Sequence, residues 1–149
     1  MHRHRIDAGI IGLSLVLAML AWAPGQVEAS IVYQFGRVGL TQAQTARVNV
    51  VNIGAPSSDV PPGPCAVRVV FLNAAGGTIR TIEDPNIMPG ETKSFDLGPL
   101  DLSFPPARAQ IRAEVTVNPG PCRSTLIPTL EVIDVASGET MVILSLPSF

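Results

Sequence analysis

Alternation of apolar and polar residues between Ala107 and Val117 is the feature that most restricts how this chain can fold. Alanine, isoleucine or valine occupies every second position, and arginine, glutamine, glutamate or threonine occupies the positions between them. In an extended strand, alternate side chains point to opposite faces, so this pattern buries one face and exposes the other. A helix would spread the same charges around its circumference. The pattern therefore predicts a half-buried β-strand.

Other apolar segments, each bounded by residues that favour turns, predict further strands. Their ranges are 31–40, 45–53, 65–72, 78–82, 91–97, 128–135 and 139–146. Segment 65–72 is apolar almost throughout, which predicts a central strand. Segment 45–53 changes phase near Val50-Val51, which predicts either a bulge or burial on both faces. We expect an all-β fold, an immunoglobulin-like β-sandwich of seven to eight antiparallel strands.

Three turns are predicted from short motifs. Met88-Pro89-Gly90-Glu91 fits a type II turn, because proline presets φ at the second position and glycine accepts a positive φ at the third. Ala136-Ser137-Gly138 predicts a hairpin between the last two strands. The adjacent carboxylates Glu83-Asp84, between Ile82 and Pro85, are expected to solvate a turn.

The N-terminal segment has the pattern of an export signal. Basic residues at positions 2–5 precede a largely apolar stretch, Ala8–Ala23, and Val27-Glu28-Ala29 suits signal peptidase, so we expect cleavage between Ala29 and Ser30. The stretch of sixteen residues is shorter than the roughly 20 that a spanning helix needs. Residues 1–29 are thus predicted to be a helical signal peptide and 30–149 a single domain. An uncleaved anchor and a cut after Ala23 are the alternatives.

Charge limits the partners of the mature chain. Seven arginines and Lys93 face ten carboxylates after residue 29, which gives a net charge near −2 without any basic run. This balance predicts no binding to nucleic acid, and none to a membrane after cleavage. We expect an exported monomer, periplasmic or extracellular, of bacterial type, whose partner is a protein or a cell-surface component.

Cys65 and Cys122 are the two cysteines, and an even count in an exported chain predicts a disulfide. Closing a loop of this length stabilises a fold by roughly 4 kcal/mol. Two free thiols or a metal pair are the alternatives; because the chain after Ala29 has no histidine, a metal site would need carboxylates, and we expect no metal or cofactor. If the strands near 48, 68 and 112 correspond to B, C and F of an immunoglobulin domain, both cysteines lie at one end of the sandwich.

Several motifs together resemble small exported bacterial proteins of unassigned function. The segments that carry the resemblance are Ala46–Asn52, Pro64-Cys65, Phe71-Leu72, Pro89–Glu91 and Thr129–Asp134. The resemblance covers most of 38–146 and implies an immunoglobulin- or fibronectin-like sandwich. It implies no functional residues, because its motifs are turn and core patterns. Unlike an antibody domain, the chain has no tryptophan after the signal segment to pack on a disulfide.

Catalytic pairs are scarce in this sequence. Nine serines remain after Ala29 but no histidine to activate one. Lys93 and Ser94 are neighbours in a predicted strand, so their side chains should point to opposite faces. Glu83 and Asp84 could support glycoside hydrolysis or weak calcium binding if both faced one cleft. We expect no enzymatic activity.

The predicted binding surface lies in two proline-rich loops, 54–64 and 118–125, which the disulfide would tie at one end of the sandwich. The candidate residues are Asp59, Val60, Pro61, Pro62, Asn118, Pro119 and Arg123. The simpler alternative is that these prolines keep connections from pairing with other chains. The polar face of 108–114 is expected to be a solvated surface rather than a docking site. The apolar tail 141–149 either completes its own sheet or is offered to a neighbour.

These observations predict a non-enzymatic exported module for binding or for a surface or accessory role. Two alternatives remain. The chain could be a structural subunit of an extracellular fibre or surface assembly that forms by strand exchange, or a hydrolase with an unusual carboxylate site.

Overall fold

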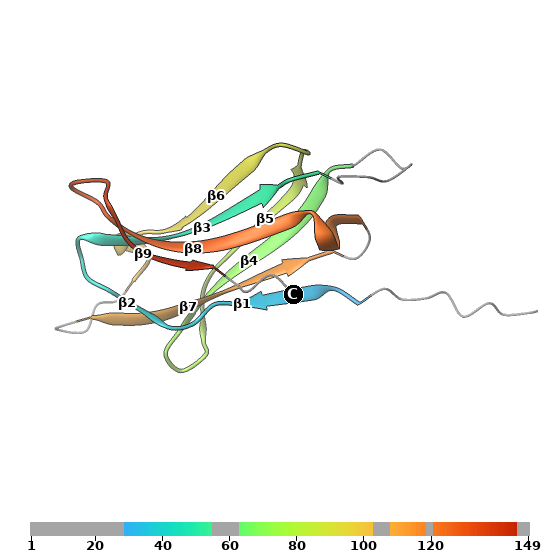
Figure 1. Cartoon of the computed structure of the whole chain (residues 1–149). Coiled ribbons are helices and arrows are strands. Elements are labelled where there is room, and N and C mark those ends of the chain that lie inside the picture. Colours follow the sequence, from blue (N-terminus) through green and yellow to red (C-terminus); the bar gives the residue numbers. More distant parts are fainter. Residues whose placement is uncertain (1–28, 55–62, 103–107, 119–120, 146–149) are drawn as a thin grey trace, which may run out of the picture.

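Two antiparallel sheets face each other in the computed structural model, which describes residues 29–54, 63–102, 108–118 and 121–145 (Figure 1). Within these residues the strands are β1 (Ile31–Gln34), β2 (Val38–Leu40), β3 (Gln44–Asn52), β4 (Cys65–Asn73), β5 (Thr78–Ile87), β6 (Thr92–Leu97), β7 (Ala109–Val117), β8 (Leu126–Asp134) and β9 (Thr140–Ser145). Two short 3₁₀ helices, η1 (Pro99–Asp101) and η2 (Pro121–Ser124), precede and follow β7. The predicted all-β sandwich is confirmed at this level.

The first sheet has the order β1-β7-β4-β5, with β2 also paired to β7, and the second has the order β6-β3-β8-β9. The core lies between the sheets and consists of alternate residues of each strand, such as Val48, Val69, Phe71, Val115 and Leu130. β7 follows the predicted period of two without a break, from Ala109 to Val117. Segment 65–72 is indeed central, because β4 pairs with both β5 and β7.

Of the two alternatives predicted for the change of phase near Val50-Val51, the bulge is excluded, and burial on both faces is confirmed in part, because the outer face is half-buried. β3 alternates between buried and half-buried residues along its whole length, and its register with β6 and β8 is unbroken. The inward series is Gln44, Ala46, Val48, Val50 and Asn52. Val51 is half-buried on the outer face opposite Ile127 of β8, so an apolar neighbour on that face, and not a change of phase, accounts for the extra valine.

The segment predicted as one first strand is two strands. β1 pairs with β7 from Ile31–Val117 to Gln34–Glu114, and β2 pairs with β7 from Val38–Ile111 onward. Between Gln34 and Val38 the first segment has three residues, whereas β7 has two between Ile111 and Glu114. The chain therefore bulges around Phe35. The Phe35 side chain is buried, and its backbone N–H donates to Ala113 O at 2.9 Å. An inserted residue here lets a large side chain reach the core.

The prediction that Glu83-Asp84 lies in a turn is also wrong. β5 continues through both residues and through Pro85 to Ile87. β5 is the edge strand of its sheet, and a register shift against Cys65–Val67 falls beside the proline. An edge strand tolerates proline because the missing N–H costs no ladder hydrogen bond on the outer side.

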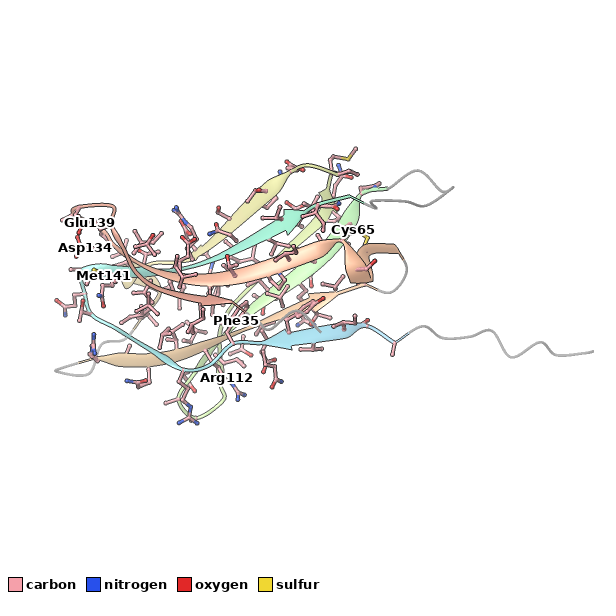
Figure 2. The ribbon with its side chains drawn as sticks, in the orientation of Figure 1. Phe35, Cys65, Arg112, Asp134, Glu139 and Met141 are labelled. Atoms are coloured by element: carbon pink, nitrogen blue, oxygen red, sulfur yellow. A yellow bond between two sulfur atoms is a disulfide. The ribbon has the colours of Figure 1, made fainter. Side chains whose placement is uncertain are left out.

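Both other predicted turns are confirmed. Gly90 has φ +81°, and Glu91 N donates to Met88 O at 3.0 Å, as a type II turn requires. β8 and β9 form the predicted hairpin, with Gly138 at φ +72°. Its turn lies at the opposite end of the sandwich from Cys65, as the labelled Asp134 and Glu139 show (Figure 2).

Candidate functional site

The predicted disulfide is present between Cys65, the first residue of β4, and Cys122 in η2. Their Cα atoms are 5.6 Å apart. The cysteines are 2% and 7% exposed, so the bond is part of the core at one end of the sandwich. The alternatives of free thiols and a cysteine metal pair are thereby excluded, and among the described residues no cluster of metal-binding side chains occurs.

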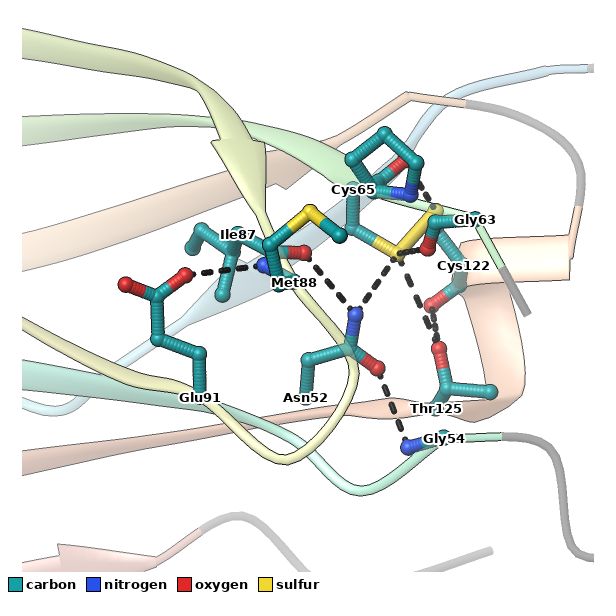
Figure 3. The surroundings of a disulfide bond; sticks show 10 residues. Asn52, Gly54, Gly63, Cys65, Ile87, Met88, Glu91, Cys122 and Thr125 are labelled. Atoms are coloured by element: carbon teal, nitrogen blue, oxygen red, sulfur yellow. Dashed lines mark hydrogen bonds between the residues drawn. A yellow bond between two sulfur atoms is a disulfide. The ribbon is translucent and has the colours of Figure 1, made fainter.

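Asn52, the last residue of β3, joins the elements around the disulfide (Figure 3). Its side-chain nitrogen donates to Ile87 O at 3.0 Å and contacts Cys65 Sγ at 3.4 Å, while its side-chain oxygen accepts from Gly54 N at 3.1 Å. Its backbone N–H and C=O pair with Glu91 O and Gly90 N. Because the residue is 1% exposed, each of these bonds satisfies a polar group that water cannot reach.

Most of the predicted binding-loop residues lie outside the described part of the chain. These are Asp59, Val60, Pro61, Pro62 and Pro119. Asn118 is exposed at the end of β7, and its N–H approaches Ala66 O at 3.4 Å. The backbone of Arg123 belongs to η2, next to the disulfide, and its side chain is not described. Both described positions are thus at the disulfide end, as the sequence predicts.

At the predicted cleavage point, Ala29 and Ser30 are exposed and directly precede β1. Residues 1–28 lie outside the description. Within the residues described, no helix is long and apolar enough to cross a membrane.

Lys93 and Ser94 point to opposite faces of β6, as predicted. Ser94 Oγ donates to Asn49 Oδ1 at 2.6 Å on the outer face. Lys93 Nζ lies 2.9 Å from Glu91 Oε1 and 3.9 Å from Asp84 Oδ2. The bond to Glu91 raises the pKa of Lys93 above its ordinary value, and the pKa of Glu91 is lowered by Lys93 and then by the N–H of Met88. A raised pKa makes the neutral amine, which a general base requires, scarcer.

Glu83 and Asp84 also point to opposite faces. Asp84 lies opposite Val67, whose side chain is in the core, and Glu83 lies opposite Arg68 on the outer face, with 3.6 Å between Arg68 Nε and Glu83 Oε1. A glycosidase needs its two carboxylates in one cleft. The structure does not bring this pair together in that way.

A polar hollow of about 400 Å³ lies on the outer face of the second sheet, beside the β8–β9 turn. Arg47 lines it and donates to both carboxylate oxygens of Asp96, at 2.7 and 2.8 Å. This bond, despite some burial, raises the pKa of Arg47. Arg47 and Asp96 therefore satisfy each other's charge within the hollow.

The remaining candidate is β9, one of the two edge strands of the second sheet in the described structure. Within the described residues it pairs with β8 alone. Three consecutive apolar residues are exposed on it, Met141 at 58%, Val142 at 42% and Ile143 at 62%. The alternative that this tail completes its own sheet is confirmed for Thr140–Ser145. A strand can nevertheless complete one sheet and still offer its other edge to a partner.

A groove of about 330 Å³ lies between β9 and the β2 region, where the two sheets separate. Its apolar wall comprises Val132, Met141, Val142 and Leu144, and its opposite wall includes Arg37, Val38 and Arg108. We call this feature the β9 groove. Sequence reasoning considered the tail but missed the groove, because β9 and β2 are brought together only by the pairing of both sheets.

Comparison of the chain with protein-family models, with curated proteins and with solved structures found no match.

Proposed function

We propose that this chain is an exported, non-enzymatic β-sandwich module that binds a protein partner through the edge of β9. The observation that carries the proposal is the exposure of Met141, Val142 and Ile143 on a strand whose outer edge is unpaired in the described structure. Exposed apolar edges are usually blunted with charge or proline, and 140–145 contains neither. Such an edge suits β-strand addition.

Export is supported by the disulfide, which is compatible with an oxidising compartment. The proposed cut after Ala29 would also leave every described strand intact, since β1 begins at Ile31. On this proposal the N-terminal residue of the protein recovered from the periplasm or the medium is Ser30. Sequencing that terminus tests it, and a recovered chain that retains residues 1–29 in the membrane fraction would contradict it.

We also propose that four of the strands have an immunoglobulin-like arrangement. If β3, β4, β6 and β7 correspond to B, C, E and F, then β3 pairs with β6 and β4 with β7, as B does with E and C with F. The strand after F lies beside F in immunoglobulin domains. Here β8 lies beside β3. The proposed relationship with exported bacterial sandwich proteins therefore concerns this central quartet.

A photoreactive residue at position 143 of the exported protein, in the cells that make it, tests the binding role. We expect a crosslinked product with a second protein. Ile127 is the matched control, because it is a 47% exposed isoleucine on the outer face of β8, away from β9, whose pairing with β8 begins at Thr129. Equal products from both positions, or none from 143, would contradict the proposal. Ile143→Lys should change the free energy of unfolding by no more than about 0.5 kcal/mol.

A structural subunit that assembles by strand exchange is the second candidate, and the same edge favours it. A second copy could pair its own β9 with this one. Size-exclusion chromatography with light scattering separates the two candidates. A monomer at high concentration supports the binding module, whereas oligomers that dissociate on Ile143→Lys support assembly.

A further inference from the structure

We propose that the partner of the β9 groove is an extended segment of another protein whose groove-facing side chains, at every second position, include both apolar and acidic ones. This inference rests on the proposed binding role of β9 and adds the chemistry of the ligand. It draws on three independent features of the groove: the backbone edge, the apolar wall and the charge of the rim.

The backbone edge offers regular pairing over Val142–Ser145. Before this segment, the register of β9 against β8 shifts between Val132–Val142 and Ile133–Thr140, so β9 has one extra residue at Met141. This bulge accounts for Met141 and Val142, although adjacent, both lining the groove. Beyond it, the outward N–H and C=O groups of β9 have no partner strand in the described structure and can pair with an added one.

The apolar wall of the groove continues the core to the surface. Val132 and Leu130 are buried on β8, and Val142 and Leu144 lie opposite them on β9. Leu144 packs against the core, but Val142 remains 42% exposed. Apolar side chains at alternate positions of an added strand would cover Val142 and fill the space between β9 and β2. This requirement selects an extended peptide over a compact surface.

The rim of the groove is unusual in its charge. Four arginines with described side chains each have a carboxylate nearby, at 2.7 Å for Arg47–Asp96, 3.6 Å for Arg68–Glu83, 3.0 Å for Arg80–Asp101 and 3.7 Å for Arg112–Glu114. Lys93 pairs with Glu91 and Asp84. Arg37 and Arg108 are the described basic side chains without such a partner, and both line the β9 groove. No carboxylate lines it.

Gly39 in β2 helps to place one of these arginines. The side chain of Arg108 passes across it, with Cδ 3.4 Å and Nε 3.6 Å from the position that a Cβ at residue 39 would take. A larger residue in β2 would crowd the arginine. Two cations without a carboxylate partner among the described residues, beside an apolar strand edge, complement carboxylates, and a charge match of this kind governs the choice of partner and the rate of association.

A second copy of the chain satisfies this chemistry less well. Its β9 would supply Thr140–Ser145, which contains no carboxylate, so that strand would bring no counter-charge to Arg37 and Arg108. An anionic membrane would match the arginines but could not pair with the free backbone groups of β9. The acidic, extended peptide is the occupant that meets all three features.

Labelled synthetic peptides test the inference against the exported, disulfide-bonded protein. The first is an eight-residue peptide with threonine at every second position and with valine and glutamate taking turns at the positions between, so that both lie on one face of the strand. The second has lysine in place of glutamate, and the third has proline in place of two central threonines. We expect the glutamate peptide to bind at least tenfold more tightly than either of the others at low salt, by fluorescence anisotropy. Binding should weaken as salt rises.

Charge reversal at the rim is the sharper test. Arg37→Glu with Arg108→Glu should abolish the preference for glutamate and favour the lysine peptide. Arg68→Glu is the control, because Arg68 is an exposed arginine on the outer face of the other sheet. Ile143→Lys should weaken all strand-forming peptides.

The outcomes separate this inference from the proposed function. Peptide binding that depends on Ile143 but not on Arg37 and Arg108 would overturn the acidic partner and leave the β9 edge as a binding surface. If neither substitution affects any interaction, both proposals fail. Binding to anionic phospholipid vesicles that exceeds binding to the glutamate peptide would overturn the inference in favour of a membrane surface, and concentration-dependent dimers that exclude the peptide would do so in favour of a second copy.

Discussion

The disulfide end of the sandwich and the β9 edge differ in whether their backbone N–H and C=O groups have hydrogen-bond partners in the described structure. Around Cys65–Cys122, the buried Asn52 pairs its side-chain atoms and its backbone groups with neighbouring elements. Along β9, one edge of the backbone has no partner strand in the described structure, and three large apolar residues beside it are exposed. The first region has the chemistry of a structural core, and the second has the chemistry of a surface that gains from being covered.

This contrast moves the candidate binding site from the disulfide end of the sandwich to the β9 groove. Proline-rich loops at the disulfide end are predicted from the sequence as the binding surface, and most of their residues lie outside the described structure. The described polar groups around Asn52 and the disulfide form hydrogen bonds with one another. Unsatisfied backbone, exposed apolar area and unpaired charge instead coincide at the β9 groove.

Loss of the disulfide should give the largest effect on stability. Replacing Cys65 and Cys122 together with alanine should lower the free energy of unfolding by about 4 kcal/mol, because the closed loop no longer restricts the unfolded chain. Urea unfolding with and without reductant measures this, and the double variant should be insensitive to reductant. A loss below about 1 kcal/mol would mean that the hydrogen bonds around Asn52 alone maintain this end.

Asn52→Ala tests those hydrogen bonds separately. Ile87 O and Gly54 N would lose their partner, and an unsatisfied buried group costs about 1–3 kcal/mol, so we expect a loss of roughly 2–3 kcal/mol. Asn49→Ala is the matched control in the same strand, because Asn49 points to the outer face and bonds Ser94; it should cost no more than about 0.5 kcal/mol. Similar losses for both variants would contradict the distinction between the two faces of β3.

The β8–β9 turn, which sets the position of β9, should respond to acid. Asp134 Oδ1 accepts from Ser137 N, Ser137 Oγ and Ala136 N, and these bonds lower the pKa of Asp134 below its ordinary value of 3.8. A lowered pKa means that the folded state favours the carboxylate, so this contribution is complete above 3.8 and is lost as the pH falls through the folded pKa.

NMR titration of the Ala136 and Ser137 amides should therefore show a midpoint below 3.8 for Asp134. The β9 edge should loosen below that midpoint while the disulfide end stays unchanged. In Asp134→Asn, which keeps an accepting oxygen, the acid transition at these amides should disappear. A midpoint at or above 3.8 would show that the turn does not depend on this carboxylate.

The order of strands along the chain followed from local patterns. Period-two alternation predicted β7 within two residues at each end, and the Met88–Glu91 motif predicted its turn. The errors have a common origin. Phe35 bulges because a core position lies within reach, and β5 extends through Pro85 because its outer side has no neighbour. Neither condition is visible in a window of ten residues.

Asn52 is a buried residue that the alternation in β3 could have predicted and that we did not expect to be buried. It continues the inward series of Ala46, Val48 and Val50, yet an asparagine at the end of a strand is more often solvated. Its burial depends on Ile87, Cys65 and Gly54, which reach it from three other segments.

The sequence by itself determined that this protein consists of short strands with one cross-link, because alternation, turn chemistry and cysteine count act over short distances or through simple arithmetic. Only the tertiary structure decided which strands would lie at the edges and which of the described arginines would lack a carboxylate among the described residues. Pairing partners are chosen among segments far apart in the chain, so the free edge of β9 and the charges of Arg37 and Arg108 are properties of the assembled sheets.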